Sequence, residues 1–353
     1  MNTFKVHPQR NKIVDVEESN KRSTAEENSV GNPEQEMIKK ILMPLTVSMQ
    51  ILGLYFEKTD KLRTSNNFWR FYCLFVSAIL WLNVIRILTI FTVDGRLQSL
   101  LVNVANTIMM VSGALVHTSC YRASEKGGIP EMLQTFNKDM FSRWAKQLRM
   151  EVVILAGIAW SVVAFVVLSG AYIFFSDHGY LNTVLAPFNT IILNSSPLTL
   201  HVISVLILVL FFYVSGSTSF SISWNYVLSS IISHEFKECT KMLHGMAKNS
   251  ETVKLNFEMV RCRHQTLCRL VEKVDDSVCI NNATYVIEFI SVIILNLYGV
   301  MCDPIAMTKS PFYLVNSLCW IFFAAIGLIV VARSGIMINQ SVRVAEPIFN
   351  VYA

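Results

Sequence analysis

The feature that most constrains the fold of this chain is a set of six long apolar stretches. They lie at 68–93, 97–120, 150–175, 200–225, 277–301 and 312–333. A helix needs roughly 17 to 25 mostly apolar residues to cross a bilayer core about 30 Å thick. An isolated strand would leave its backbone groups unpaired in lipid, so helices are the favoured spanning elements. The sequence therefore predicts an all-α, polytopic membrane helix bundle with six transmembrane helices.

The positive charges fall almost entirely on one side of these stretches. Of the 30 Lys and Arg residues, 26 lie in 1–67, 121–149, 226–276 and the tail from Arg333. The loops on the other side hold only Arg96 and Lys309. Because basic loops are retained in the cytoplasm, both the N-terminus and the C-terminus are predicted to be cytoplasmic. The net charge of +5 then reflects loops that face anionic lipid, and the lipid bilayer rather than nucleic acid is the expected partner.

Composition along the chain divides it into four segments. A charged, apolar-poor stretch at 1–40 predicts a disordered cytosolic tail. Residues 41–67 hold a short apolar run with Pro44, which predicts an interfacial or re-entrant pre-span segment packed under the bundle. The transmembrane bundle is expected at 68–334, followed by a polar cytosolic tail at 335–353.

One cytoplasmic loop, at 226–276, is patterned rather than irregular. Its apolar residues recur at helical intervals among Lys, Arg and Glu, and Asn249 and Ser250 separate two runs. This pattern predicts a cytosolic helical hairpin that extends the fourth and fifth spans. The apolar stripe of the hairpin needs a partner, either within the subunit or on a neighbouring one.

Catalytic and cofactor motifs are not apparent in the sequence. We find no nucleophile elbow, phosphate-binding glycine loop or HExxH motif, so we expect neither an enzyme nor a bound cofactor. Cys262, His264 and Cys268 have metal-ligand spacing, but they lack a convincing second pair, and no metal site is predicted. Asn194 begins an Asn-Ser-Ser glycosylation pattern in the outer loop between the third and fourth spans.

Polar residues within apolar spans are the natural candidates for ligand binding, because burial in lipid is costly unless they face a cavity or a partner. Glu288 is the sharpest of these; its carboxyl group is expected to be neutral, to face water, or to meet Arg86. The other candidates lie in the outer halves of their spans and could line a small-molecule pocket if they converge. Each is otherwise an interhelical hydrogen-bond partner or an interfacial aromatic residue. The complete set is Asn103, Asn106, Tyr172, His201, Glu288, Asn296, Tyr298, Asn316 and Trp320.

Several short patterns, taken in order, give the chain a family resemblance. They are Leu52-Gly53-Leu54-Tyr55 before the first span, Arg261-Cys262-Arg263-His264-Gln265-Thr266-Leu267-Cys268 before the fifth, Leu297-Tyr298 at its end, and Val342-Arg343-Val344-Ala345-Glu346 after the sixth. With the cytoplasmic N-terminus and the long helical loop, the chain resembles the arthropod gustatory receptor family, which is related to the insect odorant receptors. The resemblance covers roughly residues 40–350 and is diffuse.

The resemblance implies a chemoreceptor of the plasma membrane that detects small-molecule tastants. Members of the family are ligand-gated cation channels that assemble as homo- or hetero-oligomeric tetramers with related receptors, with an outer-side pocket among the second to sixth helices. Their seventh, pore-lining helix has no counterpart here, because 335–353 is too short and too polar to span. The sequence is therefore either a fragment or a six-helix variant.

Two other classes of membrane protein remain as alternatives. A G-protein-coupled-type receptor requires an external N-terminus, which the charge distribution disfavours. Secondary transporters often carry binding sites on helices interrupted by Gly or Pro. All nine prolines of this chain lie outside the six spans, which disfavours a secondary transporter.

Overall fold

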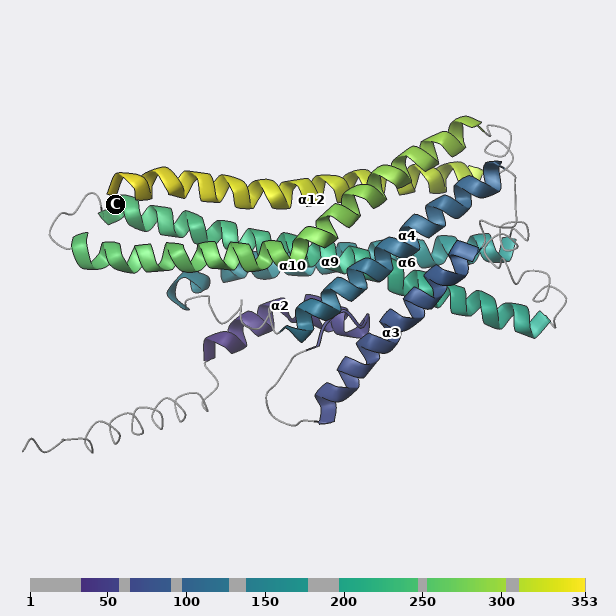
Figure 1. Ribbon diagram of the computed structural model, residues 1–353, viewed down its shortest axis with the longest axis horizontal. Helices are drawn as coiled ribbons and strands as arrows, with labels where there is room; N and C mark the ends of the chain where they lie inside the picture. The colour runs from purple at the N-terminus through teal and green to yellow at the C-terminus, as the bar shows by residue number, and fades with distance from the viewer. Residues whose placement is uncertain are drawn as a thin grey trace, which may run out of the picture.

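The computed structural model describes residues 33–56, 64–89, 97–126, 138–176, 197–246, 253–302 and 311–352, with only the backbone described near several ends of these ranges. The helices in these ranges are α2 (Pro33–Ile51), α3 (Thr64–Leu88), α4 (Leu97–Glu125), α6 (Lys138–Ser176), α9 (Pro197–Met246), α10 (Val253–Cys302) and α12 (Pro311–Tyr352). No strand occurs in the described ranges, and the chain is an all-α bundle (Figure 1).

Five of the helices are long and apolar enough to cross a membrane: α3, α6, α9, α10 and α12. The chain is therefore a multi-pass membrane protein. The second predicted span coincides with α4, which is helical but less apolar because its described part includes Asn106, Thr107 and His117. The count of six spans thus stays a prediction.

Three helices begin at a proline: α2 at Pro33, α9 at Pro197 and α12 at Pro311. Proline suits the first turn of a helix, where its fixed φ is already helical and its missing N–H costs no hydrogen bond. Asn or Ser precedes each of them in the sequence, and both residue types favour N-cap positions. Local sequence therefore explains where these helices start.

The helices α9 and α10 are each 50 residues long. At about 1.5 Å per residue they measure roughly 75 Å, more than twice the thickness of a bilayer core. The predicted hairpin at 226–276 corresponds to the end of α9 and the start of α10. In Figure 1 these segments run beside α12, which continues as a helix to Tyr352 through the segment expected as a tail.

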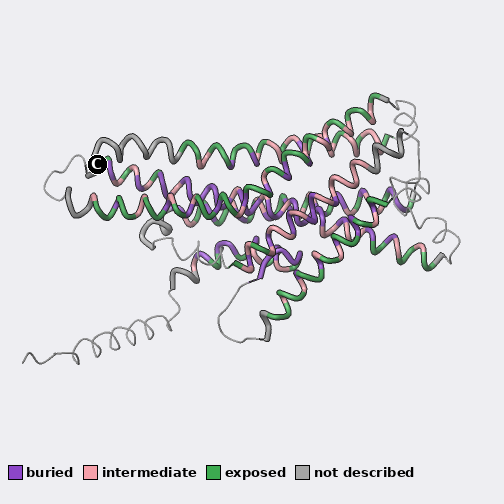
Figure 2. Tube along the Cα trace, viewed as in Figure 1, coloured by how far each residue is buried: buried purple, intermediate pink, exposed green. Residues whose placement is uncertain are grey.

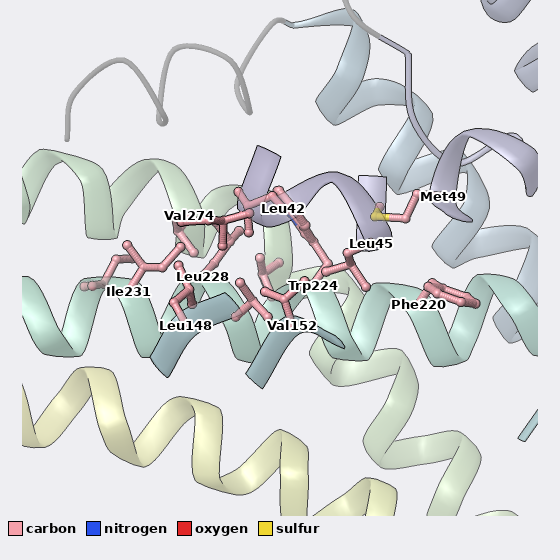
Figure 3. Close-up of a cluster of buried hydrophobic side chains, with 14 of the residues drawn as sticks. Leu42, Leu45, Met49, Leu148, Val152, Phe220, Trp224, Leu228, Ile231 and Val274 are labelled. Atoms are coloured by element: carbon pink, nitrogen blue, oxygen red, sulfur yellow. The ribbon is translucent and has the colours of Figure 1, made fainter. Parts of the chain in front are cut away.

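Two clusters of buried apolar side chains hold the bundle together. The first joins α2 to α6, α9 and α10 and includes Leu42, Leu45, Leu148 and Trp224 (Figure 3). The second lies among α3, α4, α6 and α9, in the half of the spans that the charge distribution predicts to be the outer one, and we refer to it as the outer core. Its residues are Val76, Leu80, Val84, Ile87, Met110, Ala114, Val166, Phe174, Ile207, Phe211 and Val214. Exposed residues dominate the outward faces of α3 and α12 (Figure 2).

Helix α2 packs against α6 and α9, as its apolar face requires. It begins at Pro33, inside the segment 1–40 expected as a tail; residues 1–32 lie outside the described part of the chain. Gly53, with φ of 70°, ends the helix. The N–H of Gly53 donates to the Gln50 carbonyl (3.0 Å) and that of Leu54 to the Met49 carbonyl (2.8 Å), a Schellman cap that requires the left-handed conformation glycine favours.

Two side chains from other helices hold the end of α2. The indole Nε1 of Trp160 on α6 donates to Ser48 Oγ at 3.0 Å. The hydroxyl of Tyr72 on α3 donates to the Ile51 carbonyl at 2.6 Å and lies 2.8 Å from the hydroxyl of Tyr213 on α9. The pre-span segment is thus fixed to three helices of the bundle.

In the predicted hairpin, much of the described apolar stripe is buried within the subunit, whereas Met259 of α10 is 59% exposed. Phe236 and Leu243 of α9 pack with Val260 and Leu267 of α10. A buried ion pair joins the same two helices: Arg263 donates to Glu235 Oε2 at 2.6 Å, and the Glu235 side chain is only 2% exposed. These contacts supply a partner within the subunit for most of the stripe, and contact with a neighbouring subunit stays a prediction.

Candidate functional site

Aromatic side chains join α6 to α12 in the half of the bundle predicted to be the outer one. The ring of Tyr172 lies 4.0 Å from that of Phe312, measured between centroids. Two turns further into the membrane, Phe165 lies 6.3 Å from Trp320 and 5.1 Å from Phe323. Two of the predicted candidates, Tyr172 and Trp320, therefore belong to one set of contacts, which we call the α6–α12 aromatic site.

A polar atom is available within this apolar surround. Asn316 lies four residues from both Phe312 and Trp320, and therefore on the same face of α12. Its Oδ1 is buried and has no hydrogen-bond partner among the described residues. Aromatic walls with one oriented acceptor are the combination that small-molecule sites use.

The other outer candidates are more scattered. His201 on α9 is exposed and lies 6.1 Å from the ring of Phe175. Asn106 is half-buried on α4, and Tyr298 is 40% exposed on α10. Asn296 donates to the Val292 carbonyl of its own helix at 2.8 Å. The side chain of Asn103 and the predicted glycosylation site Asn194 lie outside the described residues.

Glu288 lies apart from the aromatic site. It is buried on α10 beside Ser112 of α4, and its Oε2 has no hydrogen-bond partner among the described residues. The ion pair with Arg86 that the sequence left open does not form. The Nε of Arg86 instead donates to Asn83 Oδ1 on the same helix, at 3.0 Å.

Further polar side chains are buried on α4, α9 and α10, and sequence reasoning did not single them out. His117 of α4, Thr218 of α9, and Asn281 and Tyr285 of α10 are all nearly inaccessible to solvent. We call these four residues and Glu288 the polar seam. Each is a polar residue within a predicted apolar span, so the criterion that selected Glu288 could have found them in the inner halves of the spans.

Hydrogen bonds beside the polar seam tie its three helices together. Asn281 Nδ2 donates to Ser221 Oγ of α9 at 3.3 Å. The thiol of Cys120 on α4 donates to the same oxygen at 3.6 Å. One turn further along α9, Asn225 Nδ2 donates to Asn282 Oδ1 at 3.4 Å.

The residues with metal-ligand spacing lie on the first part of α10. Cys268 Sγ is 3.7 Å from His264 Nδ1. Within the described ranges no three His, Cys, Asp or Glu side chains come together as a metal site.

The fold of the chain is similar to that of a known receptor. Its structure matches that of the insect olfactory receptor OR5 from Machilis hrabei in complex with eugenol, with a TM-score of 0.67 and 14% identity over 89% of this chain and 90% of that chain. A second structure of OR5 matches with a TM-score of 0.65, 15% identity and the same coverage. No protein-family model and no curated protein sequence matches the chain.

At this level of identity the likeness establishes the fold. The chain has the fold of an insect olfactory receptor.

Proposed function

We propose that the chain is a chemosensory receptor that forms a subunit of a ligand-gated cation channel and detects small-molecule tastants at the plasma membrane. One observation carries this proposal: the fold of an insect olfactory receptor extends over 89% of the chain. The sequence patterns that resemble the gustatory receptors favour tastants over odorants as ligands. The same resemblance supports assembly as a tetramer, with itself or with related receptors.

The α6–α12 aromatic site is our candidate ligand site. Tyr172 and Trp320 would supply aromatic walls, and Asn316 Oδ1 would accept a hydrogen bond from the tastant. The similar receptor OR5 has been seen with eugenol, a small aromatic molecule. Asn103, Asn106, His201, Asn296 and Tyr298 remain secondary candidates toward the outer side, and Glu288 a deeper one. A tastant bound here would open the channel only if it bound the open state more tightly than the closed state.

Electrical recording tests this proposal directly. Cells that express the chain, alone or with related receptors, would be exposed to a panel of sugars, bitter alkaloids and small aromatic compounds while membrane current is measured. We expect at least one compound to evoke a cation current. Uptake of a labelled compound without any current would instead support a secondary transporter.

Variants of α12 then test the site. Trp320→Ala and Asn316→Ala should raise the half-maximal concentration of an active compound by about tenfold or more, since a lost site contact of about 1.4 kcal/mol is a factor of ten in affinity. Phe322→Ala is the matched control, because Phe322 is on the same helix but 62% exposed. Equal effects of Phe322→Ala and Trp320→Ala would contradict this location for the site.

A further inference from the structure

The polar seam contains a concentration of polar atoms without hydrogen-bond partners. They are both ring nitrogens of His117, Thr218 Oγ1, Asn281 Oδ1, the Tyr285 hydroxyl and Glu288 Oε2, none of which has a partner among the described residues. The five side chains are between 0% and 7% exposed. These groups come from three different helices, so local backbone geometry does not account for them.

Helix register places these groups at neighbouring levels. On α4 and α9, a Cβ at Gly113 would meet Val214, and Cys120 bonds Ser221; both pairs are offset by the same number of residues. The same offset places His117 level with Thr218, although the His117 ring lies beside Gly53 of the α2 end, where its Nε2 is 3.3 Å from the position of an added Cβ. On α10, Asn281 donates to Ser221 of α9, and this hydrogen bond places Asn281 at the level of Ser221, at one end of the seam.

The α10 members of the polar seam share one face of their helix. Asn281, Tyr285 and Glu288 are spaced by four and then three residues, which aligns their side chains. Tyr285 lies beside Ser221 and close to Glu288, and Glu288 lies beside Ser112 of α4. The unpartnered groups of α10 therefore share one face of that helix, which meets Ser221 of α9 at one end and Ser112 of α4 at the other. His117 lies at the margin of the seam, with its ring beside Gly53 at the end of α2.

The chemistry of these groups limits what can satisfy them. Asn281 already uses its Nδ2 as a donor to Ser221, so its Oδ1 must accept. A carboxyl oxygen of Glu288 also accepts, whereas the hydroxyls of Thr218 and Tyr285 can both donate and accept, and a neutral imidazole does one of each. Water provides two donors and two acceptors and is held in proteins by two to four such partners. A buried polar group with no partner at all costs about 1 to 3 kcal/mol.

We propose that the polar seam binds a line of internal water molecules, which run from Glu288 at mid-depth to Asn281 nearer the cytosol. These waters bridge α4, α9 and α10. The outer core, whose own residues are all apolar, is the dry reference for this comparison. The contacts among the three helices in the inner half of the bundle are thus partly water-mediated, and this does not depend on the identity of the ligand.

X-ray radiolysis tests for these waters, because hydroxyl radicals formed from bound water oxidise the side chains next to it even when bulk solvent is excluded. Tyr285 (0% exposed) would be compared with Phe174 (2% exposed) of the outer core in the full chain, in detergent or nanodiscs. The two rings have similar reactivity and similar burial. We expect Tyr285 to be labelled several-fold faster than Phe174. Equal rates would overturn the proposal.

Variants give a second measurement. In Thr218→Val and Glu288→Leu proteins that stay monodisperse, labelling of Tyr285 should fall toward the rate for Phe174. Ser215→Ala is the control, because Ser215 is buried on the same helix but already donates to the Phe211 carbonyl of its own helix at 2.8 Å. Labelling that persists in both seam variants, or falls equally in Ser215→Ala, would contradict water binding by these side chains. If the seam variants do not fold, the wild-type comparison decides alone.

Discussion

Gly113 shows how closely two helices approach at a single residue. A Cβ added there would lie 2.8 Å from Cγ1 of Val214 on α9. The β-branched Val214 side chain is stiff at χ1 and cannot readily turn away. We expect Gly113→Ala to destabilise the protein by about 1 to 3 kcal/mol, the usual cost of overpacking a well-packed core. Thermal unfolding of the detergent-solubilised protein, followed by a thiol-reactive or tryptophan fluorescence signal, measures this change.

The control for Gly113→Ala is Gly157→Ala on α6, where an added Cβ meets nothing within 4 Å. This substitution should leave the melting temperature unchanged or slightly higher, because alanine favours the helix more than glycine does. Truncating the opposing side chain gives a second check: Gly113→Ala combined with Val214→Ala should recover much of the lost stability. A double variant no more stable than Gly113→Ala would place the strain elsewhere.

At the residue scale, the sequence identifies polar residues but not their partners. Glu288 stands out because it is a carboxylic acid in an apolar span, and the structure buries it. Its neighbour Ser112 and the level of Thr218 with His117 depend on the register of three helices, which apolar periodicity does not determine. The contact between Tyr172 and Phe312 likewise needs the antiparallel packing of α6 and α12, which no local pattern shows.

Among the elements, the ion pair between α9 and α10 is a specific connection within the predicted hairpin. Arg263 and Glu235 are 2.6 Å apart, and their side chains are 18% and 2% exposed. Removing the cation leaves a buried carboxylate without its partner, which typically costs about 3 kcal/mol or more. We therefore expect Arg263→Ala to lower the melting temperature clearly and to increase proteolysis of 226–276.

The same helix provides a matched control for Arg263→Ala. Arg261, two residues away, pairs with Glu258 at 2.7 Å, but both side chains are more than half exposed. Solvent-exposed pairs contribute little, so Arg261→Ala should leave the melting temperature nearly unchanged. Similar losses from both variants would show that the burial of Glu235 does not set the strength of the pair.

The packing of α2 on the bundle should depend on the side chains of one face of the helix. Leu45 is fully buried against the first core cluster, whereas Val47, two residues on, is 39% exposed. Leu45→Ala should cost about 2 to 5 kcal/mol, because it removes buried methyl groups and leaves a cavity. Val47→Ala should cost much less. Limited proteolysis near residues 57–63 gives the measurement, and equal cleavage of the two variants would contradict the packing of α2 on the bundle.

Apolar runs in the sequence predict most helices of this fold, but they miss helical segments made of polar residues. In the described part of the chain, each of the six apolar stretches lies on a helix, and the prolines account for three helix starts. The start of α2 at Pro33 and the continuation of α12 to Tyr352 escape the same reasoning, since helix formation does not require lipid-compatible residues. Apolarity also cannot decide whether α4 spans, because its polar residues can be satisfied by neighbouring helices.

For the whole molecule, the charge distribution predicts the orientation in the membrane, and the fold then shows on which side each part of the bundle would lie. If 226–276 is cytosolic, the α9–α10 extension lies on the inside, together with α2. The α6–α12 aromatic site then lies in the outer half, within reach of an external tastant. The proposed channel function requires this orientation, whereas a G-protein-coupled-type receptor would reverse it.

Epitope insertion tests the orientation of the whole chain. A short tag placed between Asn249 and Ser250 should bind antibody only after the cells are permeabilised, and a tag at the N-terminus should behave in the same way. A tag within 177–196 should bind antibody on intact cells. Enzymatic removal of N-glycans should increase the electrophoretic mobility of the native chain but not that of the Asn194→Gln variant. The basis is the near absence of Lys and Arg from the loops on that side. Antibody binding to the 249–250 tag on intact cells would invert the topology and place the aromatic site on the cytosolic side, where an external tastant could not reach it directly.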